Sequence, residues 1–305
     1  MSTEQKTLHL VGIGVTHSIA PGMHNFIAES LGLPWTFHNT ECPTLDELDE
    51  LSKKDTTAGL VVTMPYKNIV MPKLDRVDEL ATAIGACNNV YYEPGNPRRR
   101  VGTNTDWLGI RGCLLEKGDE SRRGTKKSPV SGLIVGAGGA SRAAVYALAS
   151  HLHCSKIYVL NRDDSEVLDL IRDSKKLPVV PDIIHIRTLE EAQKADTPYY
   201  IVGTVPDLEP KTESEKNVAA MLLLFLQKPE KGVLLDMCFK PRRTRMIKSA
   251  EGLGWPCVEG THVIGYQIER QWSLWAGEER VKKLNKEGAW RCLLQAAEES
   301  KVINS

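Results

Sequence analysis

Apolar and polar positions follow two alternating spacings along the first hundred residues. Residues 8–15 form a short apolar run that ends in glycines, which predicts a buried strand, and residues 35–41 and 59–65 predict two more strands. Residues 22–33 and 44–53 carry apolar side chains at helical spacing. The resulting β-α-β-α-β order predicts a mostly parallel sheet covered by helices.

A hairpin is predicted next, because residues 88–93 and 98–106 flank the turn PGNP at 94–97. The following segment, 116–132, is polar and charged and contains three glycines. Such a composition is typical of an exposed loop near a domain boundary.

A second alternation follows that loop. Residues 132–152 predict a strand, a glycine turn and a helix, and further strands are predicted at 156–163, 199–206 and 231–239. The tail from residue 263 onward has helical periodicity and no strand signal. Because 305 residues are many for one compact core, we expect two domains of α/β class.

Composition narrows the possible partners. The chain has 39 acidic and 39 basic residues, and this zero net charge favours neither nucleic acid nor an anionic membrane as a partner. The apolar run at 219–226 is too short to span a bilayer, and the first residues lack the pattern of a secretory signal. The seven cysteines show no metal-binding or disulfide spacing, so we expect no metal site and a reduced, cytoplasmic setting.

The glycine turn in residues 132–152 carries the first candidate chemistry. Gly136, Gly138 and Gly139 come between a predicted strand and a predicted helix, with Ala140 next. Glycines allow the tight turn and the close approach of backbone to a pyrophosphate, and the helix start offers N–H groups to the anion. A further strand ends about 25 residues later, so this context predicts a dinucleotide-binding site.

The end of that further strand bears on which dinucleotide is bound. Asn161, Arg162 and Asp163 follow one another there. Arg162 would pair with the 2′-phosphate of NADP, whereas Asp163 would accept a hydrogen bond from the ribose 2′-hydroxyl of NAD and repel a phosphate. A solvated charged turn explains the same residues, and both cofactors stay open at this point.

Polar side chains also gather at predicted strand ends and turns of the first domain. Ligands of open parallel sheets bind beyond the carboxyl ends of the strands, so these side chains are candidates for a small polyol site. The candidates are Ser18, Thr63, Lys67, Asn88 and Asp106. Structural alternatives exist for these residues. Ser18 and Asp106 would also suit helix starts, Asn88 would suit a turn, and Lys67 would suit a surface charge that closes a strand.

Several segments together resemble one family, the shikimate/quinate dehydrogenases, over nearly the whole chain. These segments are GIGVTHSIAPGMHN, VVTMPYK, GACNNV, GTNTDWLG, GAGGASRA, NRD, LLDMCFKPRRTRMIKSAEGLG and GTHVIGYQ. The resemblance implies an α/β fold with an N-terminal substrate domain, whose sheet is mostly parallel, and a Rossmann-like dinucleotide-binding domain. We expect these at 1–107 and 108–260, with the helices of 261–305 returning to the substrate domain.

The resemblance also implies roles for individual residues. Lys67 corresponds to the catalytic lysine of the family and Asp106 to its aspartate partner. The expected substrate contacts are Ser18, Thr63, Asn88, Thr105 and Gln267. An amine near the reacting hydroxyl accepts its proton, or stabilises the alkoxide, as hydride leaves carbon, and a neighbouring carboxylate orients both groups.

Departures from the family pattern bear on substrate choice. The usual second serine of S-x-S is Ala20, and the usual asparagine of N-V-T is Val61. The missing hydroxyl at Ala20 leaves room near the ring carbon that carries the carboxylate, where quinate has an extra hydroxyl. The pattern is most similar to the fungal quinate dehydrogenase branch, which implies NAD.

Further departures lie near the cofactor and the closing helix. The usual N-A-T is replaced within 201–207, where Thr204 is a cofactor-binding candidate. Tyr266 either hydrogen-bonds the substrate carboxylate or packs on the closing helix, and His262 either lines the nicotinamide edge or is a packed neighbour.

Three functions remain open from the sequence. The first is NAD-dependent oxidation of quinate to 3-dehydroquinate, with shikimate as a weaker substrate. The alternatives are an NADP-dependent shikimate dehydrogenase and a non-catalytic regulator that binds the same metabolites. The presence of both Lys67 and Asp106 favours an enzyme. A small molecule is the expected partner, and both monomer and homodimer are compatible with the sequence.

Overall fold

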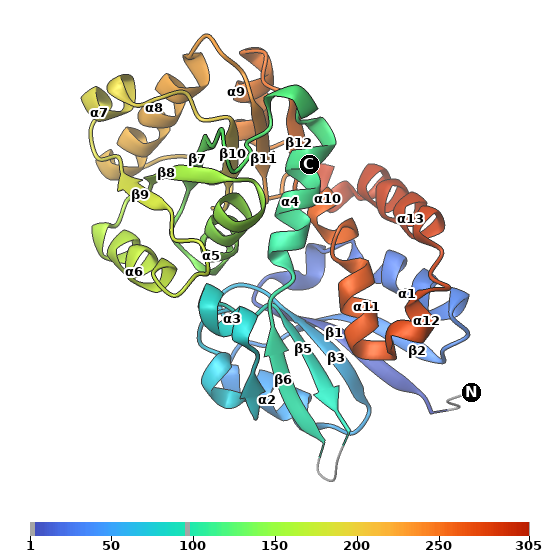
Figure 1. The fold of residues 1–305 in the computed structure, drawn as a ribbon. Coiled ribbons are helices and arrows are strands. Elements are labelled where there is room, and N and C mark those ends of the chain that lie inside the picture. The colour runs from blue at the N-terminus through green and yellow to red at the C-terminus, as the bar shows by residue number, and fades with distance from the viewer. Residues whose placement is uncertain (1–3, 95–97, 305) are drawn as a thin grey trace. The chain divides into compact units, whose positions relative to one another are not determined.

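The computed structural model describes residues 4–94 and 98–304, and it consists of two compact units (Figure 1). The first unit holds Met1–Thr105 and Ile264–Ile303, and the second holds Asp106–Val263 with the last two residues. The C-terminal helices therefore belong to the same unit as the N-terminal sheet. The assignment of substrate and cofactor domains to 1–107, 108–260 and 261–305 stays a prediction.

The first unit is built on a six-stranded sheet. In spatial order its strands are β2 (Trp35–Glu41), β1 (Lys6–Gly12), β3 (Thr57–Val62), β5 (Asn89–Glu93), β6 (Arg99–Thr103) and β4 (Arg76–Val77). Strands β1, β2 and β3 are mutually parallel, and β5 runs antiparallel to both β3 and β6. The predicted hairpin is therefore β5 and β6, and residues 95–97 of its turn at 94–97 lie outside the described residues.

Helices of this unit come from both ends of the chain. They are η1 (Val15–His17), α1 (Ala20–Ser30), α2 (Leu45–Lys53), η2 (Met71–Lys73), α3 (Glu79–Ile84), α11 (Ile268–Ala276), α12 (Glu278–Val281) and α13 (Lys286–Glu299). Two further short helices, α10 (Thr261–Gly265) and α14 (Lys301–Asn304), cross the division between the units.

Tryptophan side chains pack the C-terminal helix α11 against the first sheet. Trp272 and Trp275 of α11 are buried, and the Trp275 indole N–H donates to the carbonyl oxygen of Val90 at 3.2 Å. A Cβ atom at Gly59 would lie 2.3 Å from the Trp275 ring, so only glycine lets the indole rest on β3. These two tryptophans are therefore part of the core of the first unit.

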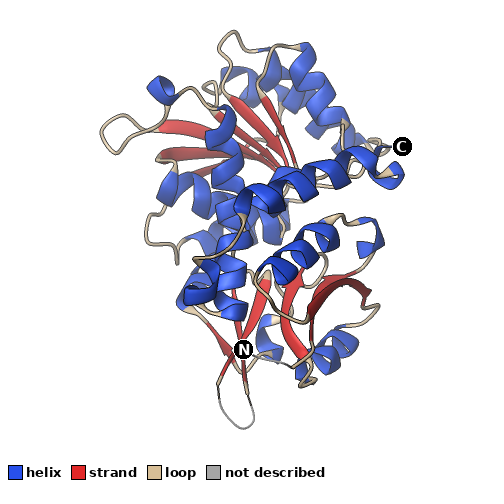
Figure 2. Ribbon diagram, turned by 90° about the vertical axis from the view of Figure 1, so that its right-hand side faces the viewer, coloured by secondary structure: helices blue, strands red, loops and turns tan. Residues whose placement is uncertain are grey.

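The second unit has an all-parallel sheet of six strands, which Figure 2 shows as red strands among blue helices. In spatial order these strands are β12 (Cys257–Glu259), β11 (Val233–Asp236), β10 (Tyr200–Gly203), β7 (Val130–Val135), β8 (Cys154–Leu160) and β9 (Asp182–His185). This order is that of the doubly wound dinucleotide-binding fold. The predicted α/β class, with a mostly parallel sheet and a Rossmann-like domain, is confirmed.

Helices alternate with these strands along the chain. They are α4 (Asp106–Lys117), η3 (Glu120–Arg122), α5 (Gly139–Tyr146), the π-helical turn η4 (Ala147–His151), α6 (Asp164–Ser174), α7 (Leu189–Lys194), α8 (Glu213–Gln227) and α9 (Arg245–Gly252). The predicted loop at 116–132 therefore contains the end of α4 and all of η3. Among the described residues, no helix is both long and apolar enough to cross a lipid bilayer.

Candidate functional site

One edge of the first sheet collects the segments that carry the polar candidates. The register pairs Val11 with Val62, Val61 with Asn89, and Asn89 with Thr103. The carboxyl ends of β1, β3 and β6 therefore lie at the same edge as the start of β5. Ser18, Thr63, Lys67 and Thr105 follow these strand ends and Asn88 directly precedes β5, so the strand topology brings their backbones together.

A buried polar network occupies this edge. Asn88 Nδ2 donates to Gln267 Oε1 at 2.9 Å, and the Thr105 hydroxyl donates to the same oxygen at 2.6 Å. Asn88 Oδ1 accepts the backbone N–H of Thr105 at 2.6 Å. These three residues are all less than a tenth exposed. Three of the expected substrate contacts, from segments far apart in the chain, therefore touch one another.

Gln271 extends this network and was missed by the sequence analysis. Its Nε2 donates to the Thr105 hydroxyl at 3.3 Å and to Gln267 Oε1 at 3.4 Å. The only available signal was its position four residues after Gln267, on the same face of α11.

The turn after β3 is held rigidly by its backbone and by one buried tyrosine. The N–H of Thr63 donates to Val11 O at 2.9 Å, and the Tyr66 hydroxyl donates to Cys42 O at 2.6 Å. The carbonyl oxygen of Lys67 accepts the N–H of Cys87 at 2.7 Å. This bond ties the backbone of Lys67 to the residue just before Asn88. The side chain of Lys67 is half-buried.

The buried hydrogen bond of Tyr66 accounts for the tyrosine in the sequence Pro-Tyr-Lys. Its ring is 3% exposed, and burial raises the pKa of its hydroxyl, which therefore stays a hydrogen-bond donor at neutral pH. The tyrosine anchors the turn in the core while the half-buried lysine follows it directly.

The loop that carries Ser18 is fixed by two residues that the sequence analysis did not single out. The carboxylate of Glu41 accepts the three consecutive N–H groups of residues 14–16, at 2.8, 2.6 and 3.3 Å. Asn39 Nδ2 donates to the carbonyl oxygen of Ser18 at 2.7 Å. The Ser18 hydroxyl oxygen accepts the N–H of Ala20, the first residue of α1, at 3.3 Å. Ser18 thus supports a helix start, as its structural alternative supposed, and remains half-buried.

Asp106 is the first residue of α4 and is 4% exposed. It follows Thr105, whose N–H is held by Asn88, so the start of α4 is tied by the chain to the buried network. Lys67 and Asp106 fall in different compact units. Their pairing stays a prediction.

The glycine turn of the second unit fits a dinucleotide. Gly136 has φ +115°, and a Cβ atom there would lie 2.4 Å from Thr204 Oγ1, so glycine is required. Gly138 is the N-cap of α5, has no side-chain cap, and would carry a Cβ atom with nothing within 4 Å. Gly139 and Ala140 are the first two residues of the helix. The turn therefore has the open backbone that a pyrophosphate needs.

Thr204 supports this turn from the end of β10. Its hydroxyl donates to Val135 O at 2.8 Å and lies 2.8 Å from the Ser141 hydroxyl. Because a hydroxyl has one proton, Ser141 is the donor of the second bond. Through these two hydrogen bonds Thr204 stabilises the loop that precedes α5.

The residues after β8 are engaged with the protein itself. Arg162 forms an ion pair with Glu215. The Asp163 carboxylate caps α6, and its bonds to the hydroxyl and N–H of Ser165 lower its pKa. Asn161 Nδ2 donates to the carbonyl oxygen of Asp163 at 2.9 Å. The turn therefore carries an ionised aspartate and an arginine whose positive charge is paired with Glu215.

Tyr266 has an aromatic contact and His262, on α10, has a polar one. The Tyr266 ring meets the Trp290 ring edge-on, with centroids 4.9 Å apart. His262 Nδ1 lies 2.8 Å from the carboxylate of Glu116 on α4. The proposed roles of both residues stay predictions.

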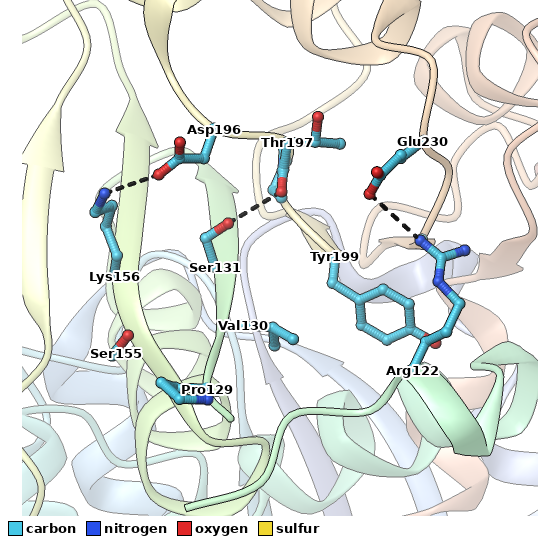
Figure 3. Close-up of a pocket in the computed structure, with 12 residues that line it drawn as sticks. Arg122, Pro129, Val130, Ser131, Ser155, Lys156, Asp196, Thr197, Tyr199 and Glu230 are labelled. Atoms are coloured by element: carbon cyan, nitrogen blue, oxygen red, sulfur yellow. Dashed lines mark hydrogen bonds and ion pairs between the residues drawn. The ribbon is translucent and has the colours of Figure 1, made fainter. Parts of the chain in front are cut away.

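A cavity of about 490 Å³ opens at the amino ends of the strands of the second sheet, whereas the glycine turn lies at their carboxyl ends (Figure 3). It is lined by residues at the amino ends of β7, β8 and β10, including Val130, Ser155 and Tyr199. Its charged groups pair with one another, Lys156 with Asp196 at 2.8 Å and Arg122 with Glu230 at 3.9 Å. None of the predicted site residues lines it, because those residues follow the carboxyl ends of the strands.

Comparison with known proteins agrees with this architecture. Residues 10–90 match the family model described as shikimate dehydrogenase substrate binding domain. The chain is 32% identical over 294 residues to a quinate dehydrogenase of Emericella nidulans, a match that covers 90% of this chain and 89% of that protein. It is 34% identical to the pentafunctional AROM polypeptide of Eremothecium gossypii, of which it spans only 17%.

Solved structures show the same two-domain fold. A shikimate 5-dehydrogenase of Thermus thermophilus, solved in complex with NADP(H) and shikimate, superposes with a TM-score of 0.73 at 26% identity, covering 95% of this chain and 99% of that one. The dehydroquinate dehydratase and shikimate dehydrogenase portion of AroM from S. pombe superposes with a TM-score of 0.72 at 30% identity, covering 95% of this chain and 53% of that one.

The fold and these relatives define an NAD(P)-dependent oxidoreductase that acts on a CH–OH group. Within that class, the chain belongs to the quinate/shikimate dehydrogenase family, as the resemblance of its motifs implies.

Proposed function

We propose that this enzyme oxidises quinate to 3-dehydroquinate with NAD, and shikimate to 3-dehydroshikimate more slowly. The observation that carries the proposal is the buried network of Asn88, Thr105 and Gln267, beside which the backbone of Lys67 is bonded to Cys87. Such a cluster of amides and a hydroxyl, next to a lysine, suits a ring that carries several hydroxyl groups.

Lys67 and Asp106 are the proposed proton-transfer pair. The nicotinamide ring, when bound, accepts the hydride. Lys67 takes the proton of the reacting hydroxyl, or stabilises the alkoxide as it forms, and Asp106 orients the lysine and the hydroxyl. The proposed substrate contacts are Ser18, Thr63, Asn88, Thr105, Gln267 and Tyr266.

The cofactor would lie along the carboxyl ends of β7, β8 and β10. Gly136, Gly138, Gly139 and Ala140 are proposed to receive the pyrophosphate, and Thr204 to hold the turn beside it. Asn161, Arg162 and Asp163 are proposed to meet the adenosine ribose.

Two features favour NAD over NADP. The lowered pKa of Asp163 keeps a negative charge where a 2′-phosphate would lie, and negative charges repel. The pairing of Arg162 with Glu215 reduces the charge that it offers to a phosphate.

An absorbance assay tests the choice of substrate and cofactor. We expect the highest kcat/KM for quinate with NAD when quinate and shikimate are each tried with NAD and NADP, with nicotinamide reduction followed at 340 nm. Highest kcat/KM for shikimate with NADP would instead support the second candidate, an NADP-dependent shikimate dehydrogenase.

Ala20 is the proposed reason for quinate preference. It is the first residue of α1, where the family pattern has a serine. We expect Ala20→Ser to lower the ratio of kcat/KM for quinate to that for shikimate by about 10-fold, the effect of roughly one hydrogen bond or one steric conflict.

Gly22→Ser provides the matched control for Ala20→Ser. Gly22 lies on the same helix, is exposed, and has open space at its Cβ position, so the added hydroxyl should leave the ratio unchanged. An unchanged ratio in Ala20→Ser would remove Ala20 from the explanation of specificity.

A further inference from the structure

A buried arginine lies directly under the glycine turn of the second unit. Arg142 is the fourth residue of α5 and is 8% exposed. Its Nη1 donates to the carbonyl oxygens of Ala137 and Gly138, at 3.0 and 3.3 Å. A fully charged side chain is rarely buried unless its donors are used, and here they are used on the backbone of the turn.

The other side of the guanidinium is held by α6. Arg142 Nε and Nη2 both donate to Asp173 Oδ2, at 3.1 and 2.8 Å. Burial by itself would raise the pKa of Asp173, but the hydrogen bonds and charge of Arg142 lower it, so the aspartate is ionised. Arg142 is therefore fixed at both ends, between the last turn of α6 and the glycine turn.

The geometry of the peptide unit gives this contact a consequence. In a trans peptide the C=O group and the following N–H group point in opposite directions. The Arg142 guanidinium orients the carbonyl of Ala137, and it orients that of Gly138 together with the backbone N–H of Arg142, which lies 3.2 Å from the same oxygen. The N–H groups of Gly138 and Gly139 therefore point away from the guanidinium, and the space at the Cβ position of Gly138 is open.

We propose that Arg142, held by Asp173, is a positioning residue for cofactor binding that aims the N–H groups of Gly138 and Gly139 at the pyrophosphate. This inference rests on the proposed cofactor site. Arg142 does not contact the pyrophosphate in this account. It keeps the turn carbonyls from facing a negatively charged ligand and leaves the donors to face it.

The test uses ADP, which contains the pyrophosphate, and adenosine, which does not. We expect Arg142→Lys to raise the dissociation constant of ADP by about 10-fold, because a compact ammonium lacks the planar fork by which the guanidinium reaches the carbonyls on one side and the carboxylate on the other. Asp173→Asn is expected to raise it by roughly 3-fold, because the arginine is then less firmly held. Adenosine should bind within about 2-fold of wild type in both variants.

Calorimetry for ADP, and ligand-observed NMR competition for the weaker adenosine, measure these constants on the full-length protein. Lys176→Met is the matched control, because Lys176 also contacts Asp173, at 3.4 Å, and its described contacts include no carbonyl of the turn. It should leave ADP binding unchanged.

The outcomes separate this inference from the proposed function. If ADP binds wild type without competing with NAD, the proposed cofactor site is wrong. If ADP competes with NAD but binds the Arg142 and Asp173 variants normally, only the role of Arg142 is wrong. An equal loss of ADP and adenosine would indicate general damage to the domain and would also overturn the positioning role.

Discussion

Replacing Lys67 with alanine is expected to lower kcat for quinate oxidation by about 10²–10⁴-fold, the range for losing one proton-transfer group. The dissociation constant of NAD should stay near its wild-type value, because Lys67 lies in the first unit and the glycine turn lies in the second. The turn that carries Lys67 should persist, since it is anchored by the buried Tyr66 and by backbone bonds. Steady-state rates at saturating NAD, with calorimetric titration of NAD, measure both effects.

Lys73→Ala is the control for this substitution. Lys73 follows on η2, and its Nζ bonds to Asp46 Oδ1 at 3.0 Å on the protein surface. Its loss should leave kcat unchanged. Partial recovery of Lys67→Ala by added ethylamine would further identify the lost group as an amine. Near-normal turnover in Lys67→Ala would refute the catalytic assignment.

Short-range patterns were enough to predict much of the architecture. The glycine turn was recognisable because the positive φ of Gly136 and the open backbone at Gly138 both favour glycine, which is visible in the sequence itself. The strands β2 and β7 were predictable because each combines a suitable length with β-branched or aromatic residues and clear boundaries. Strands β9 and β12 were missed, since they have four and three residues and depend on pairing with neighbours for their existence.

From the residues alone, the candidate site was predictable where polar side chains lie at the ends or starts of strands. Thr63 directly follows β3 and Asn88 directly precedes β5, and the topology of the sheet fixes which strand ends and starts meet. Glu41 and Gln271 were missed because their roles depend on contacts made after folding. The Glu41 carboxylate meets three N–H groups more than twenty residues earlier in the chain, and the Gln271 amide meets a threonine hydroxyl from the opposite end of the unit.

The inward orientation of Arg142 could not be predicted from the sequence either. In the sequence it stands in a helix of small residues, where an arginine is expected to reach solvent. Its inward orientation depends on Asp173, thirty-one residues later on α6. Side chains whose function is to hold a loop in place, through a partner on another element, leave no local pattern that would reveal them.

Replacing Asp106 with asparagine is the second change with a large expected effect. The substitution keeps the shape of the side chain and removes its charge, so we expect kcat for quinate to fall by about 10²–10³-fold while NAD binding is retained. Asparagine suits the start of a helix, so the free energy of unfolding should change by less than about 1 kcal/mol. Rates at saturating substrate and thermal unfolding measure the two quantities separately.

Two comparisons distinguish a catalytic aspartate from a structural one. Asp78→Asn makes the same change at the start of α3, where the Asp78 carboxylate accepts the N–H of Ala81 at 2.8 Å, and it should leave kcat unchanged. The double variant Lys67→Ala, Asp106→Asn should be hardly slower than Lys67→Ala alone, because residues that act as one unit lose their joint contribution once. If the two losses instead multiply, Asp106 acts independently of Lys67 and does not orient it. A kcat near wild type in Asp106→Asn would exclude the aspartate from the reaction altogether.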